Sequence, residues 1–132
     1  TLKTEYALRA LEEIIDQKSN KPVPRRQIAK NRMISEHFLE KIFISLQKRD
    51  IIRSVKGPGG GFVLARDIKD ITLWDIYSAV DDPDNRIDGC YHKTTDGCQL
   101  KSKCKTKNIW FKFADVLKKS MSSISLGDIA EE

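Results

Sequence analysis

Residues 34–62 read ISEHFLEKIFISLQKRDIIRSVKGPGGGF, and they contain a helix signal followed by a hairpin signal. Ser35 is a favoured N-cap residue, and the helix that it predicts runs to about Arg49. Ile34 and Leu39 stand on either side of this cap in the positions of a hydrophobic staple. Apolar residues recur at steps of three and four and predict one buried face, made by Leu39, Ile42, Phe43 and Leu46.

Two short apolar runs, at residues 51–55 and 62–65, follow this helix and are expected to be strands. Between them lies Lys56-Gly57-Pro58-Gly59-Gly60-Gly61, which is rich in turn-forming residues. A phosphate-binding loop would continue into Lys-Ser or Lys-Thr on a helix, whereas here a strand follows. The pattern therefore predicts a β-hairpin with a flexible tip and argues against a nucleotide site.

Upstream of residue 34, apolar spacing predicts a helix over about 3–16, with Thr4 as its N-cap. A polar loop with two prolines precedes a short helix over about 25–30, and Asn31 and Arg32 are expected to form a tight turn. Two short helices joined by a tight turn, followed by a two-stranded hairpin, make a winged helix-turn-helix. The predicted fold class is therefore mainly α with a small β-wing.

Downstream of the hairpin, a short helix is expected over 72–80 with Thr72 as its cap, and a long helix over about 105–122. A long helix outside the winged-helix core needs a surface to cover its apolar stripe. A winged-helix protein that binds a two-fold symmetric DNA operator must dimerise. The same helix of a second subunit is therefore the expected partner. The alternative is that the helix folds back on its own domain. The predicted dimerisation residues are Ile109, Trp110, Phe113, Val116, Leu117 and Met121.

Three parts are expected in the chain: a winged-helix DNA-binding domain (1–80), a cysteine-containing loop (81–104), and a dimerisation helix with a C-terminal tail (105–132). Residues 1–66 carry 14 Lys+Arg and 7 Asp+Glu, a net charge of +7, whereas residues 67–132 carry 10 and 12, a net charge of −2. A basic half is the electrostatic signature of nucleic-acid binding, with a solvated basic surface as the alternative.

No apolar run approaches the ~20 residues of a membrane span, and no signal peptide opens the chain, so a cytoplasmic location without membrane contact is expected. Apart from the cysteines considered below, the sequence contains no cofactor motif, and it contains no candidate acid–base pair for catalysis. We therefore expect a protein that is not an enzyme.

The helix that begins at Ser35 is expected to enter the major groove of an operator, with half-sites roughly one helical turn, ~10 bp, apart. Its polar face offers Ser35, Glu36, His37, Glu40 and Lys41 to base edges or phosphates. For Glu40 the alternative is an ion pair with a nearby cation. Phosphate or minor-groove contacts are expected from two further groups: Arg25, Arg26 and Gln27 on the preceding helix, and Lys56, Gly59 and Gly60 at the hairpin tip.

Three cysteines lie close together in the spacing C-x7-C-x5-C, at Cys90, Cys98 and Cys104. An odd, clustered set does not suit a secreted disulfide framework and indicates a metal site or a redox sensor. Thiolates are the usual ligands of iron–sulfur clusters. Structural zinc sites usually pair their cysteines as C-x2–4-C, but His92 keeps a Cys₃His zinc site open. A metal-free thiol switch is the third possibility.

Several blocks of the chain together resemble the Rrf-two family of bacterial winged-helix regulators. They are LKTEYALRA (2–10), ISEHFLEKI (34–42), VKGPGGGF (55–62), SAVD (78–81), the three cysteines leading into Trp110, and ISLGDI (124–129). The resemblance covers nearly the whole chain in order and spacing. It implies a homodimeric transcription regulator whose cysteine loop holds an iron–sulfur cluster, the state of which sets its affinity for DNA.

The resemblance also bears on the fourth cluster ligand and the signal. Relatives use a histidine shortly after the third cysteine, where this chain has Lys107, or a carboxylate near the partner's N-terminus, which Glu5 matches. The prediction is therefore Glu5 of the other subunit, with His92 as runner-up, and a [4Fe–4S] rather than a [2Fe–2S] cluster. The signal would be nitric oxide, iron, or cluster or redox status. A zinc- or thiol-based redox regulator on the same scaffold is the alternative.

Overall fold

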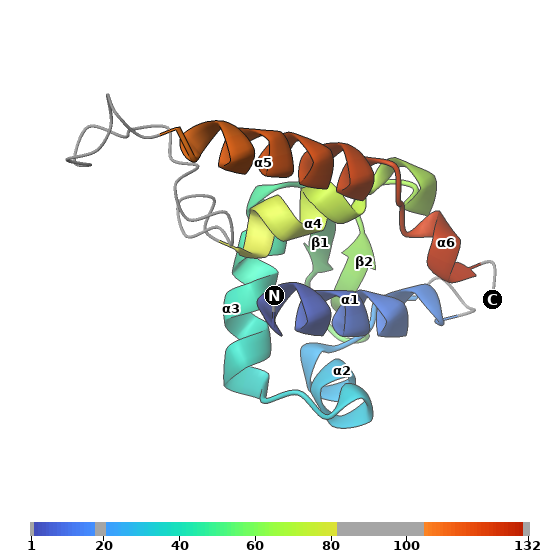
Figure 1. Cartoon of the computed structure of the whole chain (residues 1–132). Coiled ribbons are helices and arrows are strands. Elements are labelled where there is room, and N and C mark those ends of the chain that lie inside the picture. The colour runs from blue at the N-terminus through green and yellow to red at the C-terminus, as the bar shows by residue number, and fades with distance from the viewer. Residues whose placement is uncertain (1, 18–20, 82–104, 131–132) are drawn as a thin grey trace.

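The computed structural model describes residues 2–17, 21–81 and 105–130. Within them the fold is mainly helical with one small antiparallel sheet, as predicted (Figure 1). The elements, in chain order, are α1 (Leu2–Ile15), α2 (Arg25–Arg32), α3 (Glu36–Lys48), β1 (Ile52–Val55), β2 (Gly61–Leu64), the 3₁₀ turn η1 (Ile68–Asp70), α4 (Leu73–Val80), α5 (Lys107–Ser122) and α6 (Gly127–Ala130).

One hydrophobic core joins the first four helices to the base of the wing. The expected apolar face of α3 is buried, and it meets the buried faces of α1, α2 and α4. Burial of such side chains contributes about 1.5–3 kcal/mol each, so this shared core fixes how α2 and α3 are placed. The largest fully buried side chains include Leu11, Ile28, Leu39, Phe43, Leu46 and Ile76.

The expected N-cap of the first helix is wrong. The helix begins at Leu2, and Thr4 lies inside its first turn, where it is 5% exposed. Its hydroxyl donates a hydrogen bond to the carboxylate of Asp81, which follows α4. The Thr4 hydroxyl therefore makes a tertiary contact with Asp81 and is not a local N-cap.

The turn between α2 and α3 lies at Met33 rather than at Asn31 and Arg32. Both of those residues belong to α2, and Met33 takes the left-handed conformation (φ 55°, ψ 48°). The Arg32 guanidinium lies 3.1 Å from the Glu12 carboxylate and 2.9 Å from that of Glu13, both on α1, and 2.9 Å from that of Asp16, which directly follows α1. This cluster holds α2 against α1.

The cap of α3 is confirmed. The Ser35 hydroxyl accepts a hydrogen bond from the backbone N–H of Phe38 at 3.3 Å, and both Ile34 and Leu39 are buried. The helix ends at Lys48, one residue before the expected end.

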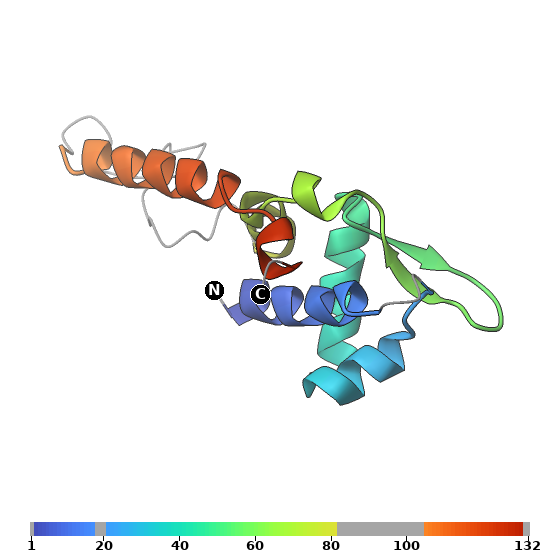
Figure 2. The same cartoon turned by 90° about the vertical axis from the view of Figure 1, so that its right-hand side faces the viewer.

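The wing is a hairpin in which Ile52 faces Leu64 and Val55 faces Gly61. One further contact of the hairpin was not predicted from the sequence. Val23 forms an isolated β-bridge with Phe62 through two backbone hydrogen bonds, of 3.0 and 2.9 Å. The Phe62 ring packs edge-on against Phe43 of α3, with 4.6 Å between centroids. The base of the wing is thus fixed to α3, while its tip projects from the body (Figure 2).

The C-terminal part packs on α4. The expected cap of α4 is confirmed as a capping box between Thr72 and Asp75. Helix α5 runs along α4 and extends beyond the body of the domain (Figures 1 and 2). After it, backbone hydrogen bonds from Leu73 to Ile124 (2.8 Å) and from Leu126 to Ile71 (2.9 Å) bring the tail back over the core. None of the described helices is long and apolar enough to cross a membrane.

Candidate functional site

The polar face of α3 lies open to solvent. Because Leu39, Ile42, Phe43 and Leu46 face the core, the opposite side of the helix is left without cover. All five residues predicted there are exposed, namely Ser35, Glu36, His37, Glu40 and Lys41. Ile44, one turn further along, is 47% exposed. A capped helix with a free polar face at its N-terminal end is the arrangement that major-groove readers present.

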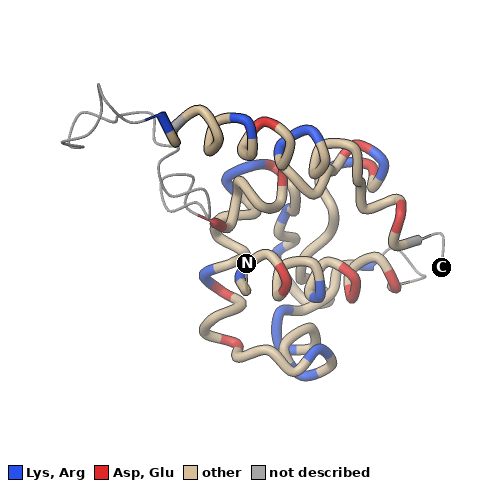
Figure 3. Tube along the Cα trace, viewed as in Figure 1, with Lys and Arg blue, Asp and Glu red and all other residues tan. Residues whose placement is uncertain are grey.

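Arg25 links α2 to this face. Its Nε lies 3.7 Å from the Oε1 atom of Glu36, and its Nη1 lies 3.8 Å from the Oε1 atom of Glu40. The ion pair considered as the alternative for Glu40 is therefore present. Arg26 and Gln27 are exposed beside Arg25. Figure 3 shows basic positions along α2 and charges of both signs along α3.

The tip of the wing presents Lys56, which is exposed, and a tight glycine turn. The N–H of Gly60 donates to the carbonyl of Gly57 at 2.9 Å. A Cβ on Gly60 would lie 2.2 Å from the Val55 carbonyl oxygen, so a side chain has no room there. Gly59 has φ +75°, a conformation that favours glycine. The wing therefore owes its narrow tip to these glycines.

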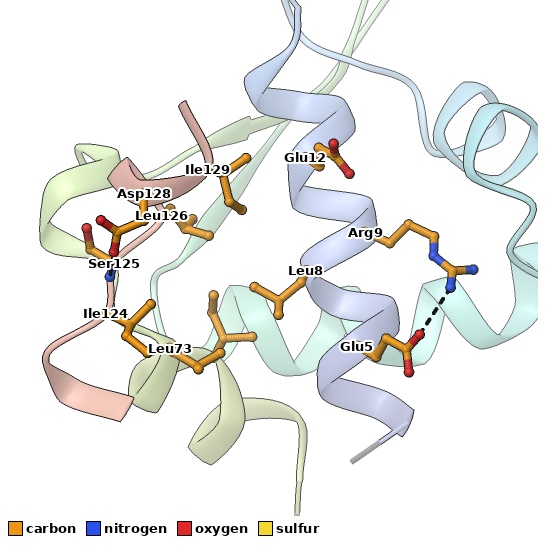
Figure 4. A pocket seen from close by; sticks show the side chains of 11 residues that line it. Glu5, Leu8, Arg9, Glu12, Leu73, Ile124, Ser125, Leu126, Asp128 and Ile129 are labelled. Atoms are coloured by element: carbon orange, nitrogen blue, oxygen red, sulfur yellow. Dashed lines mark hydrogen bonds and ion pairs between the residues drawn. The ribbon is translucent and has the colours of Figure 1, made fainter. Parts of the chain in front are cut away.

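Glu5 lies on the first turn of α1 and is exposed. Its side chain is 65% exposed, and its Oε1 atom is 3.4 Å from Nη2 of Arg9 in an i,i+4 ion pair. It lines an open hollow of about 460 Å³ between α1, α4 and the C-terminal segment (Figure 4). The floor of the hollow is apolar, formed by Leu8, Leu73, Ile76, Ile124, Leu126 and Ile129.

The predicted cluster ligands Cys90, Cys98 and Cys104, and the runner-up His92, lie outside the described residues. In residues 2–17, 21–81 and 105–130, no three His, Cys, Asp or Glu side chains gather as a metal site would require. The chemistry of the donor set still suits iron and sulfide, because three thiols within 15 residues can supply soft thiolate ligands.

The predicted dimerisation stripe of α5 divides into two faces within one chain. Trp110, Leu117 and Met121 are partly buried, on the same side as Ala114, which is 4% exposed. Ile109, Phe113 and Val116 stay 66%, 42% and 64% exposed. One side of α5 thus packs on its own domain, and a second apolar ridge has no cover in the part of the chain that the structure describes.

Two features of the site were not indicated by the sequence pattern. One is the bridging position of Arg25, because residues 25 and 40 belong to different helices and their proximity depends on the tertiary packing. The other is the hydrogen bond between Thr4 and Asp81, which links positions 77 residues apart. For the first feature, the sequence signal was the opposite charge of Arg25 to Glu36 and Glu40. Such charges indicate that ion pairs can form, but not which residues form them.

The chain matches the Rrf2 family, described as iron-dependent transcriptional regulators, over residues 1–132. It is 33% identical over 129 residues to the HTH-type transcriptional regulator IscR of Cronobacter sakazakii, a match that covers 98% of this chain and 78% of the relative.

Solved structures agree with this assignment. IscR of T. potens superposes with a TM-score of 0.75 at 26% identity, covering 99% of this chain and 85% of that one. CymR (YrzC), the global cysteine regulator of B. subtilis, gives a TM-score of 0.74 at 24% identity over 99% of this chain and 95% of that one, and shows the shared fold. By sequence over its full length and by fold, the chain belongs to the Rrf2 family of winged-helix transcriptional regulators, and it is related to IscR.

Proposed function

We propose that this regulator is a homodimer that binds a two-fold DNA operator and whose affinity for it is set by an iron–sulfur cluster. The observation that carries the DNA-binding part is the exposed, capped face of α3 beside a glycine-tipped wing with Lys56 at its end. In this proposal residues 1–80 bind DNA, residues 81–104 sense, and residues 105–132 dimerise. The protein is not an enzyme and acts in the cytoplasm.

Each DNA-facing group has a distinct role in the proposal. Ser35, His37, Glu40 and Lys41 face base edges or phosphates in the major groove, because they occupy the open side of α3. Lys56 enters the minor groove, where narrow A·T tracts attract cations. Arg26 and Gln27 on α2, with the backbone at Gly59 and Gly60, hold phosphates and fix the register of the complex.

For the sensor we propose Cys90, Cys98 and Cys104 as ligands and Glu5 of the second subunit as the fourth, with His92 as the runner-up and a [4Fe–4S] cluster favoured. The family description as iron-dependent supports this choice over zinc. The exposure of Glu5 supports its role: its pair with Arg9 is a surface ion pair, worth only about 0.3–0.5 kcal/mol, so the carboxylate is available to another partner. A bound cluster would supply a redox- and nitric-oxide-sensitive group beside α1.

The apolar ridge of Ile109, Phe113 and Val116 supports dimerisation through α5. Exposed apolar surface of this kind on a helix commonly marks a protein interface. In a dimer the ridge would be covered by the second subunit, and the DNA-reading helices would be repeated about a two-fold axis.

The test is an ultraviolet–visible spectrum with iron and sulfide counts on protein purified without oxygen, followed by operator binding. A broad band near ~400 nm with about four iron and four sulfide per chain supports the [4Fe–4S] sensor. About two of each indicates [2Fe–2S]. A protein that stays colourless after reconstitution contradicts the cluster, and bound zinc or reversible thiol oxidation would then support the alternative regulator on the same scaffold.

A further inference from the structure

The N-terminal half of the exposed face of α3 carries two acids that a single arginine bridges. Glu36 and Glu40 are one helical turn apart, and their side chains are 47% and 51% exposed. Arg25, the first residue of α2, reaches across to both of them. A helix that approaches DNA with two carboxylates in front meets the repulsion of the phosphates unless those charges are balanced.

The contacts of Arg25 are ion pairs that leave hydrogen-bond donors unused. Its distances of 3.7 and 3.8 Å to the two carboxylates are those of ion pairs and lie beyond hydrogen-bond range. The Nε atom is itself buried, and within the described part of the chain it has no hydrogen-bond partner. Part of the donor capacity of the guanidinium is therefore unused. A small movement of Glu36 or Glu40 would convert either ion pair into a hydrogen bond.

We propose that Arg25 is a positioning residue for base recognition, which rests on the proposed DNA-binding function and goes beyond it. Arg25 orients the Glu40 carboxylate toward the groove, where it accepts a hydrogen bond from the N4 amino group of cytosine. It also balances the charges of Glu36 and Glu40 so that α3 can approach the phosphates. Arg25 thus acts on sequence preference through Glu40 rather than by reading a base itself.

The competing role for Arg25 is a simple phosphate contact, as expected from its place at the start of α2. The two roles differ in what they change. A phosphate contact lowers the affinity for every duplex by the same factor and lowers the salt slope of binding by about 0.9 per contact. A positioning role changes the preference at one base pair and depends on the presence of Glu40.

The experiment starts from duplexes selected from a random library by the wild-type protein, which define the motif and its preferred cytosine. Dissociation constants are then measured for the best duplex, for the duplex with that C·G pair replaced, and for an unrelated duplex, at several salt concentrations. The variants are R25Q, E40Q, the double variant and R25K. R26Q is the matched control, because Arg26 is the exposed neighbour and the charge change is equal.

For R25Q we expect the preference for the cytosine to fall about tenfold, close to the value of E40Q, with no further loss in the double variant. R25K should restore part of the preference, since it keeps the charge without the fork. R26Q should weaken all duplexes alike. Equal thermal unfolding temperatures of the variants and the wild type exclude a folding defect. If R25Q does not fold, R25K is compared with E40Q and R26Q in its place.

Three results would overturn the proposal while leaving DNA binding intact. In the first, R25Q behaves like R26Q; in the second, the effects of R25Q and E40Q add. In the third, E40Q leaves the preference for the cytosine unchanged, so that Glu40 reads no base. A wild-type protein that selects no motif would overturn the proposed function, and the role of Arg25 with it.

Discussion

The Thr4 hydroxyl donates a hydrogen bond to the carboxylate of Asp81, and this contact joins the first turn of α1 to the end of α4. Asp81 also donates its backbone N–H to the carbonyl of Tyr77 at 2.9 Å, which closes α4. It directly precedes residues 82–104, which contain the three cysteines, and Thr4 directly precedes Glu5. Within one subunit, Asp81 is therefore anchored beside the turn that carries Glu5.

Replacing Thr4 with valine tests this anchor. The side chain keeps its shape but loses the donor, so the Asp81 carboxylate loses a hydrogen bond from a buried partner. We expect the free energy of unfolding to fall by about 1–3 kcal/mol, measured by urea denaturation. Thr4→Ser keeps the hydroxyl and is the control, with a smaller loss from the missing methyl group. A Thr4→Val protein as stable as the wild type would show that the bond contributes nothing.

Thr4 also shows where sequence reasoning about this fold succeeds and where it does not. Ser35 and Thr72 cap their helices as predicted, because a cap depends only on residues three positions away. Thr4 carries the same local signal, but the distant partner Asp81 engages its hydroxyl. In the same way, Arg32 lies in α2 where a turn was predicted, and its carboxylate partners come from the distant Glu13 of α1 and from Asp16 just after that helix.

In the candidate site, too, the features that depend on local spacing were predictable and those that depend on tertiary packing were not. Amphipathic spacing was enough to place the exposed face of α3, since the buried stripe fixes the open one. Spacing could not show that Arg25 lies between Glu36 and Glu40, or that half of the α5 stripe is used within its own chain. These relationships arise only when separate helices pack together.

Lys56 at the tip of the wing is expected to contribute affinity without much sequence preference. In Lys56→Ala one cation is removed from an exposed position, so operator affinity should fall and the slope of log K against log salt should decrease by about 0.9. Measurements of binding between about 50 and 200 mM salt would determine the slope. Lys56→Arg should keep it, because the charge is retained. A slope that Lys56→Ala leaves unchanged would place the wing away from the DNA.

Gly60 tests the shape of the wing. A Cβ there would lie 2.2 Å from the Val55 carbonyl oxygen and 2.8 Å from that of Gly57, and both are backbone atoms that can move only if the turn opens. We expect Gly60→Ala to cost about 1–3 kcal/mol of stability and to weaken operator binding, measured by urea unfolding and by fluorescence anisotropy.

Pro58→Ala is the control for Gly60→Ala, because it changes the same loop without adding a Cβ against backbone. It should affect both measurements less. Equal behaviour of the two variants would mean that the tip rearranges without cost.

The apolar ridge of α5 predicts how the dimer can be separated. Phe113→Glu places a charge on the 42% exposed ring position, so the dimer dissociation constant should rise at least about tenfold by sedimentation velocity. Lys112→Gln changes the net charge by the same amount at an exposed neighbouring position and should leave the dimer intact. A dimer unaffected by Phe113→Glu would exclude this ridge from the interface.

Glu5→Gln tests the proposed fourth ligand, and Arg9→Gln supplies a matched control. Both variants break the same ion pair of 3.4 Å, but only Glu5→Gln removes the carboxylate. Since an amide is a weaker iron ligand than a carboxylate, Glu5→Gln should lose iron faster to a chelator under anaerobic conditions, followed by the decay of visible absorbance. Arg9→Gln should hold iron as the wild type does. If the two variants lose iron at the same rate, Glu5 is not a ligand, and the corresponding His92→Ala variant then decides whether the runner-up holds that position.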